Sequence, residues 1–294
     1  MTTVATILNR ASRQMLAGVV EERNKLASSL DSSTTTVVLT YDLGGLRAGS
    51  VFEVDSELFY VWTAVASTKT LTVDRGFSGS TAASHASAAN VTLSPRFPRV
   101  AMLDAVNAEL NDLSSTANGL FRVVATSLTY NGSDRQINIT SSGTILELLD
   151  VRLRYLADEY PIINGVRLQT GLPTSDFASG NSLVFDQAVM AGTIRLRYKA
   201  PFTTAATEAS DLTTDCFLPA TCDDIIELGV IMRLMAPREI KRNFTESQSD
   251  TRRAEEVQAG AIAQSVANVM RLRRERIIAE AGRLKAQYPI KFRK

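Results

Sequence analysis

The sequence predicts an α+β protein in which a bundle of about four helices, the last one long, carries two inserted antiparallel β domains. Apolar residues recur at the helical period near both ends of the chain. Two intervening stretches alternate apolar and polar residues in short runs separated by turn signals, which is typical of antiparallel strands. Each stretch begins and ends beside a helical segment, as an inserted domain requires.

The domain boundaries follow from these changes of period. Residues 1–30, 97–118 and 219–287 make the predicted helical core, residues 33–96 a small β-barrel or sandwich, residues 119–217 a larger β-sandwich, and residues 288–294 an extended tail. Independent domains joined like beads on a string would leave the first two helices without partners. Helices of that length are marginal in water on their own, which favours the bundle.

The predicted helices differ in how much apolar surface they must bury. The first, over about 2–28, is amphipathic, and the second begins at Arg99. The third is apolar on nearly every side from Ile225 to Met235, so we expect it at the centre of the bundle, ended or kinked by Pro237. The last runs from about 249 to 287 with a long apolar stripe, formed by Val257, Ala261, Ile262, Val266, Val269, Ile277, Ala281, Leu284 and Tyr288.

Short alternating runs predict the strands of the two β domains. In the smaller domain the candidate strands are 34–39, 50–54, 57–62, 71–73 and 90–93. In the larger domain they are 121–126, 136–139, 144–156, 162–168, 182–185 and 193–198. Asn-Gly and Gly-Asn pairs between these runs are hairpin signals.

Length and charge bound the possible functions. The chain has 294 residues and a formal net charge of +1, so it is not a uniformly basic binder of nucleic acid. Between Arg252 and Lys294, however, it carries 11 Arg and Lys residues against 4 Asp and Glu residues. This asymmetry predicts that the C-terminal end meets an acidic surface. Neither a signal peptide nor a bilayer-spanning segment is recognisable, so we expect synthesis in a cytosol-like compartment and no membrane association.

No constellation of residues predicts catalysis, a cofactor or a metal site. A Ser–His–acid site, or a zinc site with Cys216 and Cys222, would have to use His85, the single histidine. Neither a placed nucleophile nor a fourth zinc ligand accompanies it, so we interpret His85 as a solvated loop residue. The two cysteines are interpreted as free thiols, with one disulfide as the alternative. Two carboxylate pairs are interpreted as structural, Asp55 with Glu57 and Glu255 with Glu256.

Two C-terminal features predict contacts with other molecules. The basic block is either a solvated helix face or a contact for an acidic partner or for passing DNA, and it comprises Arg271, Arg273, Arg274 and Arg276. The tail alternates apolar and basic side chains, which suits strand addition to the sheet edge of a partner better than disorder. Its residues are Tyr288, Pro289, Ile290, Lys291, Phe292, Arg293 and Lys294.

The C-terminal third resembles a known family in three segments: 224–239, 254–260 and 272–289. An acid-rich start with Val and Gly, an Arg-rich middle and a Leu…Tyr-Pro end are similar to the last helix of the head-to-tail adaptor (connector) proteins of tailed bacteriophages. The smaller β domain resembles a small domain of phage virion proteins over 54–57, 71–80 and 83–85. The larger β domain matches nothing specific.

The resemblance implies a structural virion protein of the neck and not an enzyme. Such adaptors form a twelve-fold ring beneath the portal, with helices around a DNA channel and a C-terminal segment that docks into the portal. The expected partners are therefore further copies in a dodecameric ring, the portal protein, neck or tail terminator proteins and the packaged double-stranded DNA. The alternative is another tail, baseplate or capsid-decorating protein whose β domain binds a host surface or glycan.

Overall fold

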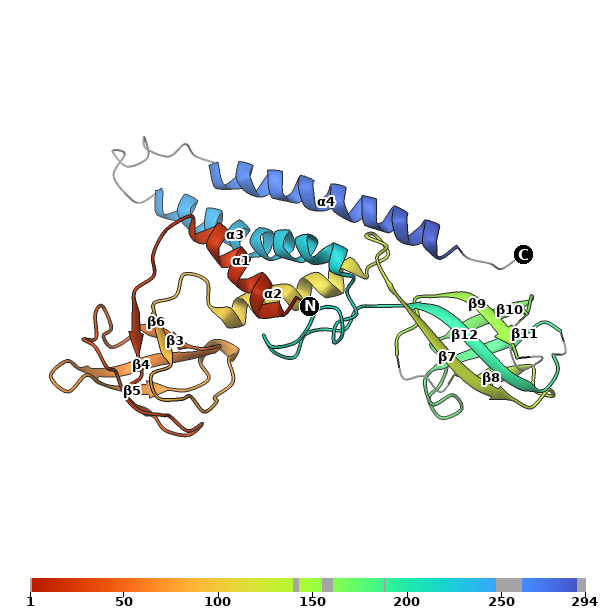
Figure 1. The fold of residues 1–294 in the computed structure, drawn as a ribbon, viewed down its shortest axis with the longest axis horizontal. Helices are drawn as coiled ribbons and strands as arrows, with labels where there is room; N and C mark the ends of the chain where they lie inside the picture. Colours follow the sequence, from red (N-terminus) through yellow and green to blue (C-terminus); the bar gives the residue numbers. More distant parts are fainter. Residues whose placement is uncertain (1, 140–142, 155–160, 188, 247–260, 290–294) are drawn as a thin grey trace. The chain divides into compact units, whose positions relative to one another are not determined.

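Figure 1 shows a computed structural model of the chain, which describes residues 2–139, 143–154, 161–187, 189–246 and 261–289. The chain divides into two compact units. The first unit comprises Met1–Glu109, Ala205–Asp215 and Asp223–Arg273, and the second comprises Leu110–Thr204, Cys216–Cys222 and Arg274–Lys294.

The predicted helical bundle with two inserted β domains is wrong. The protein is α+β, but the described residues contain 12 strands in three sheets and only four α-helices. Among the described helices, α1 (Val4–Leu16) and α3 (Asp223–Glu246) pack most closely on one another. Each β region encloses a hydrophobic core of its own. Apolar periodicity identifies the face that a helix buries but not the element that covers it, which is why periodicity alone favours a bundle.

Helix α1 is shorter than the sequence predicts. The side-chain oxygen of Thr3 accepts a hydrogen bond from the backbone N–H of Thr6 at 3.4 Å and so caps the N-terminus. At the other end Ala17 takes the left-handed conformation, with φ of 47°, and Gly18 follows with φ of 86°. These two residues end the helix at Leu16. The charged segment beyond them, expected to be helical, contains a short strand instead.

The smaller β region is a six-stranded antiparallel sheet curled into a half-barrel. Its strands are β1 (Arg23–Lys25), β2 (Thr36–Val38), β3 (Val51–Val54), β4 (Glu57–Val65), β5 (Thr70–Asp74) and β6 (Asn90–Leu93), in the order β1-β6-β3-β4-β5-β2. A bridge between Leu26 and Leu39 joins the ends of the two edge strands. The stacked rings of Phe52 and Phe59, with centroids 4.8 Å apart, lie in its core. Five of the six strands lie where the sequence predicts them.

The larger β region consists of two three-stranded antiparallel sheets. One has the order β7-β12-β9, formed by Arg122–Tyr130, Gly192–Ala200 and Glu147–Leu153. The other has the order β10-β11-β8, formed by Val166–Thr170, Asn181–Phe185 and Gln136–Asn138. Side chains from both sheets share one core, in which the rings of Tyr130 and Phe185 lie 5.0 Å apart. All six candidate strands of this region overlap observed ones.

Two further helices complete the architecture. Helix α2 (Arg99–Leu113) follows the half-barrel as predicted, and α4 (Ala261–Gln287) is the long C-terminal helix. Helix α3 continues through Pro237, so of the two predicted effects of this proline an end of the helix is wrong, and a kink stays a prediction. Within the described ranges, no helix combines the length and the apolar character needed to cross a membrane.

Candidate assembly surface

The basic block of α4 is divided between the interior and the surface. The Arg273 side chain is 11% exposed and its Nε donates to Glu109 at 2.5 Å. Arg276 donates to the carbonyl oxygen of Thr221 at 2.9 Å and lies 3.7 Å from the carboxylate of Glu280. Arg271 and Arg274, in contrast, are exposed. The four arginines predicted as a set of contacts therefore separate into two that hold the fold and two that face outward.

Glu109 of α2 is the reason that Arg273 turns inward. Its side chain is fully buried, and burial raises its pKa, although the hydrogen bonds and charges of Arg273 and Arg233 partly offset this. Arg233 of α3 donates from Nε to the second carboxylate oxygen at 3.2 Å. One buried carboxylate thus ties α2, α3 and α4 together, because leaving it without its cations would be costly.

Gly229 of α3 makes room for this carboxylate. A Cβ added at position 229 would lie too close to the Glu109 carboxyl carbon for two atoms that are not bonded. Glu109 can move aside only by disturbing its hydrogen bonds to Arg233 and Arg273. We infer that glycine is required here for close approach and not for backbone conformation.

The outward face of α4 combines basic and large apolar side chains. Met270 is 50% exposed and Ile278 is 62% exposed. At 100° per residue, these two lie on the same face as Arg271 and Arg274. The predicted stripe lies beside this face: Val266, Ile277, Ala281 and Leu284 are buried, and Val269 and Tyr288 are half-buried. Val257 lies outside the described residues.

Only the start of the predicted docking tail can be placed. The backbone N–H of Tyr288 donates to the carbonyl oxygen of Leu284 at 2.9 Å, and Pro289 is exposed. Tyr288 also lies near enough to Arg197 to contribute to the raised pKa of that guanidinium, whose main cause is the hydrogen bond to Asp150. The remaining tail residues lie outside the described part of the chain: Ile290, Lys291, Phe292, Arg293 and Lys294.

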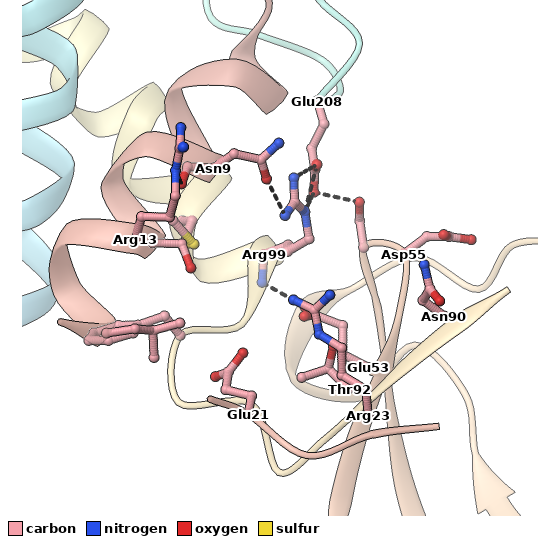
Figure 2. A pocket seen from close by; sticks show the side chains of 15 residues that line it. Asn9, Arg13, Glu21, Arg23, Glu53, Asp55, Asn90, Thr92, Arg99 and Glu208 are labelled. Carbon is pink, nitrogen blue, oxygen red and sulfur yellow. Dashed lines mark hydrogen bonds and ion pairs between the residues drawn. The ribbon is translucent and has the colours of Figure 1, made fainter. Parts of the chain in front are cut away.

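A polar cavity of about 750 Å³ in the first unit is organised by Arg99, the first residue of α2 (Figure 2). Its Nε lies 2.8 and 2.7 Å from the two carboxylate oxygens of Glu208. Its Nη1 donates to the side-chain oxygen of Asn9 on α1 at 3.0 Å. Its backbone N–H donates to Glu53 of β3 at 2.6 Å. Ser56, in the turn between β3 and β4, donates to Glu208 at 2.7 Å. Arg99 therefore fastens the half-barrel to α1 and to the loop that carries Glu208.

Glu53 has an unusual environment for a carboxyl group. Burial raises its pKa to about 7, despite the opposing hydrogen bond and charge of Arg99. A carboxyl with such a pKa in a cavity is a candidate acid or base. The cavity wall, however, is a mixture of cations and carboxylates in which Arg99 and Glu208 already satisfy one another. We therefore interpret the raised pKa of Glu53 as a consequence of its burial where the half-barrel contacts the first residue of α2.

His85 is buried, so its interpretation as a solvated loop residue is wrong. Its Nδ1 lies 2.8 Å from Asp55 and its Nε2 lies 2.9 Å from Glu57. Both ring nitrogens can donate to carboxylates only when the ring carries two protons. Arg75 clasps the same Glu57 with two hydrogen bonds of 2.7 and 2.8 Å. The carboxylate pair Asp55 and Glu57 therefore holds the polar loop that carries His85 in place. The sequence alone does not reveal this contact, because two strands separate His85 from the carboxylates along the chain.

The same network argues against chemistry at His85. Burial alone would raise the pKa of Glu57, but hydrogen bonds from Arg75, Ala83 N, His85 and Gly76 N lower it to about 2. Both ring nitrogens are engaged by carboxylates, so neither faces a nucleophile that it could activate. Cys216 and Cys222 are both buried, and neither forms a disulfide. Within the described residues, no group of three or more His, Cys, Asp or Glu side chains is placed to hold a metal ion.

Two comparisons with known proteins found no match. No family model matches the sequence, and no curated protein is significantly similar to it.

We predict that Glu53→Gln flattens the pH dependence of stability. Because the pKa of Glu53 is raised from 4.5 to about 7, its contribution is fully present below pH 4.5 and is lost as the pH rises through about 7. The amide keeps an acceptor for Arg99 N–H but never ionises. The variant should match the parent near pH 4 and exceed its free energy of unfolding by roughly 2 kcal/mol at pH 8. Denaturant titrations across this range measure the difference, and parallel pH curves would contradict the assignment.

We predict opposite effects of alanine at two helical glycines. Gly229→Ala should lower the free energy of unfolding by about 1–3 kcal/mol, because the new methyl group displaces the buried Glu109 carboxylate. Gly282→Ala on α4 is the matched control, since nothing lies within 4 Å of a Cβ there. It should raise stability by about 0.5–1 kcal/mol through helix propensity. Chemical denaturation of both variants measures these changes in the free energy of unfolding. If Gly229→Ala leaves this free energy unchanged, the Glu109 side chain can move aside.

Proposed function

We propose that this protein is a structural virion component, a head-to-tail adaptor that forms a ring between the portal and the neck or tail of a tailed bacteriophage. The observation that carries the proposal is the outward face of α4, where Met270, Arg271, Arg274 and Ile278 are exposed together. Large apolar side chains grouped with arginines are typical of protein–protein interfaces. The same helix contains much of the segment that resembles the adaptor family.

In this proposal the protein works through contacts and not through catalysis. Copies assemble into a ring, expected to be dodecameric, in the host cytoplasm and remain in the virion neck. Residues 288–294 dock into the portal, the neck or tail terminator proteins bind on the opposite side, and packaged double-stranded DNA passes through the channel. Arg271 and Arg274 are the members of the basic block available for these contacts, since Arg273 and Arg276 bind within their own chain.

Support for a non-catalytic role comes from how the ionisable groups are used. His85, Glu57 and Arg75 satisfy one another, and Arg99 and Glu208 do the same. The Ser56 hydroxyl does donate to Glu208, but that carboxylate is already paired with Arg99, which weakens it as the base that covalent catalysis requires.

We predict that removing residues 288–294 abolishes binding to portal rings and leaves the fold intact. Helix α4 ends at Gln287, before this tail, and the two hydrophobic cores described above include none of the tail's residues. Co-sedimentation of the full chain and the truncated chain with purified portal measures binding, and circular dichroism checks the fold. Undiminished binding by the truncated chain would contradict the docking role of the tail. Density for the chain away from the head–tail junction of intact particles would contradict the adaptor function itself.

A second candidate function rests on the aromatic surface of the half-barrel. Trp62 on β4 is 58% exposed, and its ring meets that of Tyr60 edge to face at 4.9 Å. Exposed aromatic side chains of this kind favour a tail or capsid-decorating protein that binds a host glycan or cell surface through the half-barrel.

Because Trp62 is the only tryptophan, its fluorescence reports directly on this second candidate. If the half-barrel binds a glycan, host-surface polysaccharide should shift or quench the emission with saturation, and Trp62→Ala should remove binding. The adaptor proposal predicts no saturable change on adding polysaccharide. Acrylamide quenching of the same tryptophan serves as the positive control for its exposure.

A further inference from the structure

Two arginines of α4 lie on its exposed surface. Arg271 and Arg274 are exposed and form no ion pair with another described residue. Together with Met270 and Ile278 they make one continuous face over two turns of a single helix. We call this set of four residues the α4 face.

A second surface of the same chain has the opposite charge and a similar apolar content. It is a cleft of about 470 Å³ in the first unit, bounded by the polar loop of the half-barrel, the segment 206–208 and one side of α2. Helix α2 contributes Val100, Leu103, Asp104 and Asn107, which follow the i, i+3, i+4, i+7 spacing of one helix face. Val100 and Leu103 are half-buried, so the wall of the cleft is partly apolar.

The charges of the cleft leave two carboxylates facing outward. Of the four that line it, Glu57 is neutralised by Arg75 and Glu208 by Arg99. Asp104 is exposed and pairs with no described cation. The Asp55 side chain touches His85 but remains 65% exposed. Two exposed carboxylates beside two apolar side chains thus match the two guanidinium groups and two apolar side chains of the α4 face.

We propose that the α4 face of one copy docks into this cleft of a second copy of the chain. The proposal rests on the ring function above and specifies its subunit contact. Two different surfaces that complement one another make a heterologous contact, which repeats from copy to copy and closes into a ring when the rotation allows. Complementary charge sets the register of such a contact, and the apolar side chains supply buried area.

A charge-exchange experiment tests the contact with the full-length chain. Arg274→Glu places like charges opposite Asp104, and Asp104→Arg places like charges opposite the α4 face. Each variant alone should self-associate at least about tenfold more weakly than the parent, because opposed like charges cost several kcal/mol at an interface. An equimolar mixture should recover association, since the α4 face of the first variant then meets the cleft of the second. Sedimentation velocity over a concentration series measures all three.

Matched controls and competing occupants make the outcome decisive. Lys25→Glu and Asp176→Arg make the same charge changes at exposed positions outside both surfaces and should associate like the parent. If single variants associate normally while the parent forms rings that bind portal, this contact is wrong and the adaptor function stands. If the parent neither self-associates nor binds portal, both fall. If instead Arg274→Glu abolishes binding of duplex DNA and leaves self-association unchanged, the α4 face serves DNA and the proposal is overturned.

Discussion

The first unit depends on the ion pair between Arg99 and Glu208. Arg99 opens α2, and its backbone and side chain together contact β3, α1 and the loop at 205–211. That loop in turn pairs with the start of α1, where Ala5 N–H donates to the carbonyl oxygen of Glu208 at 2.9 Å. Four segments remote in sequence therefore meet at one residue: the backbone N–H of Arg99 binds β3, and its guanidinium, whose rigid planar donors can satisfy several acceptors at once, binds α1 and the loop.

Other buried carboxylates are held in the same way. Glu57 collects Arg75, His85 and two backbone N–H groups, and Glu109 collects Arg233 and Arg273. Asp150 in the larger β region collects Arg152 and Arg197. Burying an ion pair contributes little net stability compared with an apolar contact, but removing one partner leaves a costly unpaired charge. Such groups therefore select which segments come together more than they raise the overall stability.

The sequence predicts elements well and their partners poorly. Every strand with alternating apolar residues was predictable, because the period of two is local. Strand β1 was not, since only Asn24 of its three residues is buried and the strand has no apolar pattern. The stop of α1 depends on the left-handed turn at Ala17, a residue that rarely adopts it. The burial of His85 and the inward turn of Arg273 depend on carboxylates 28 and 164 positions away, which no local pattern encodes.

The division of the basic block sharpens where assembly contacts should be sought. Arg273 cannot contact a partner protein without breaking its ion pair with Glu109, whose side chain has no exposure to water. Arg276 similarly binds the backbone before α3 and the Glu280 carboxylate. Folding therefore accounts for two of the four arginines and leaves Arg271 and Arg274 without a structural role among the described residues. An exposed arginine is well solvated by water. Here, however, the two exposed arginines lie beside Met270 and Ile278, whose apolar side chains are exposed as well. A surface of that composition is stabilised most when an acidic, partly apolar surface covers it, and the chain carries one on the side of α2.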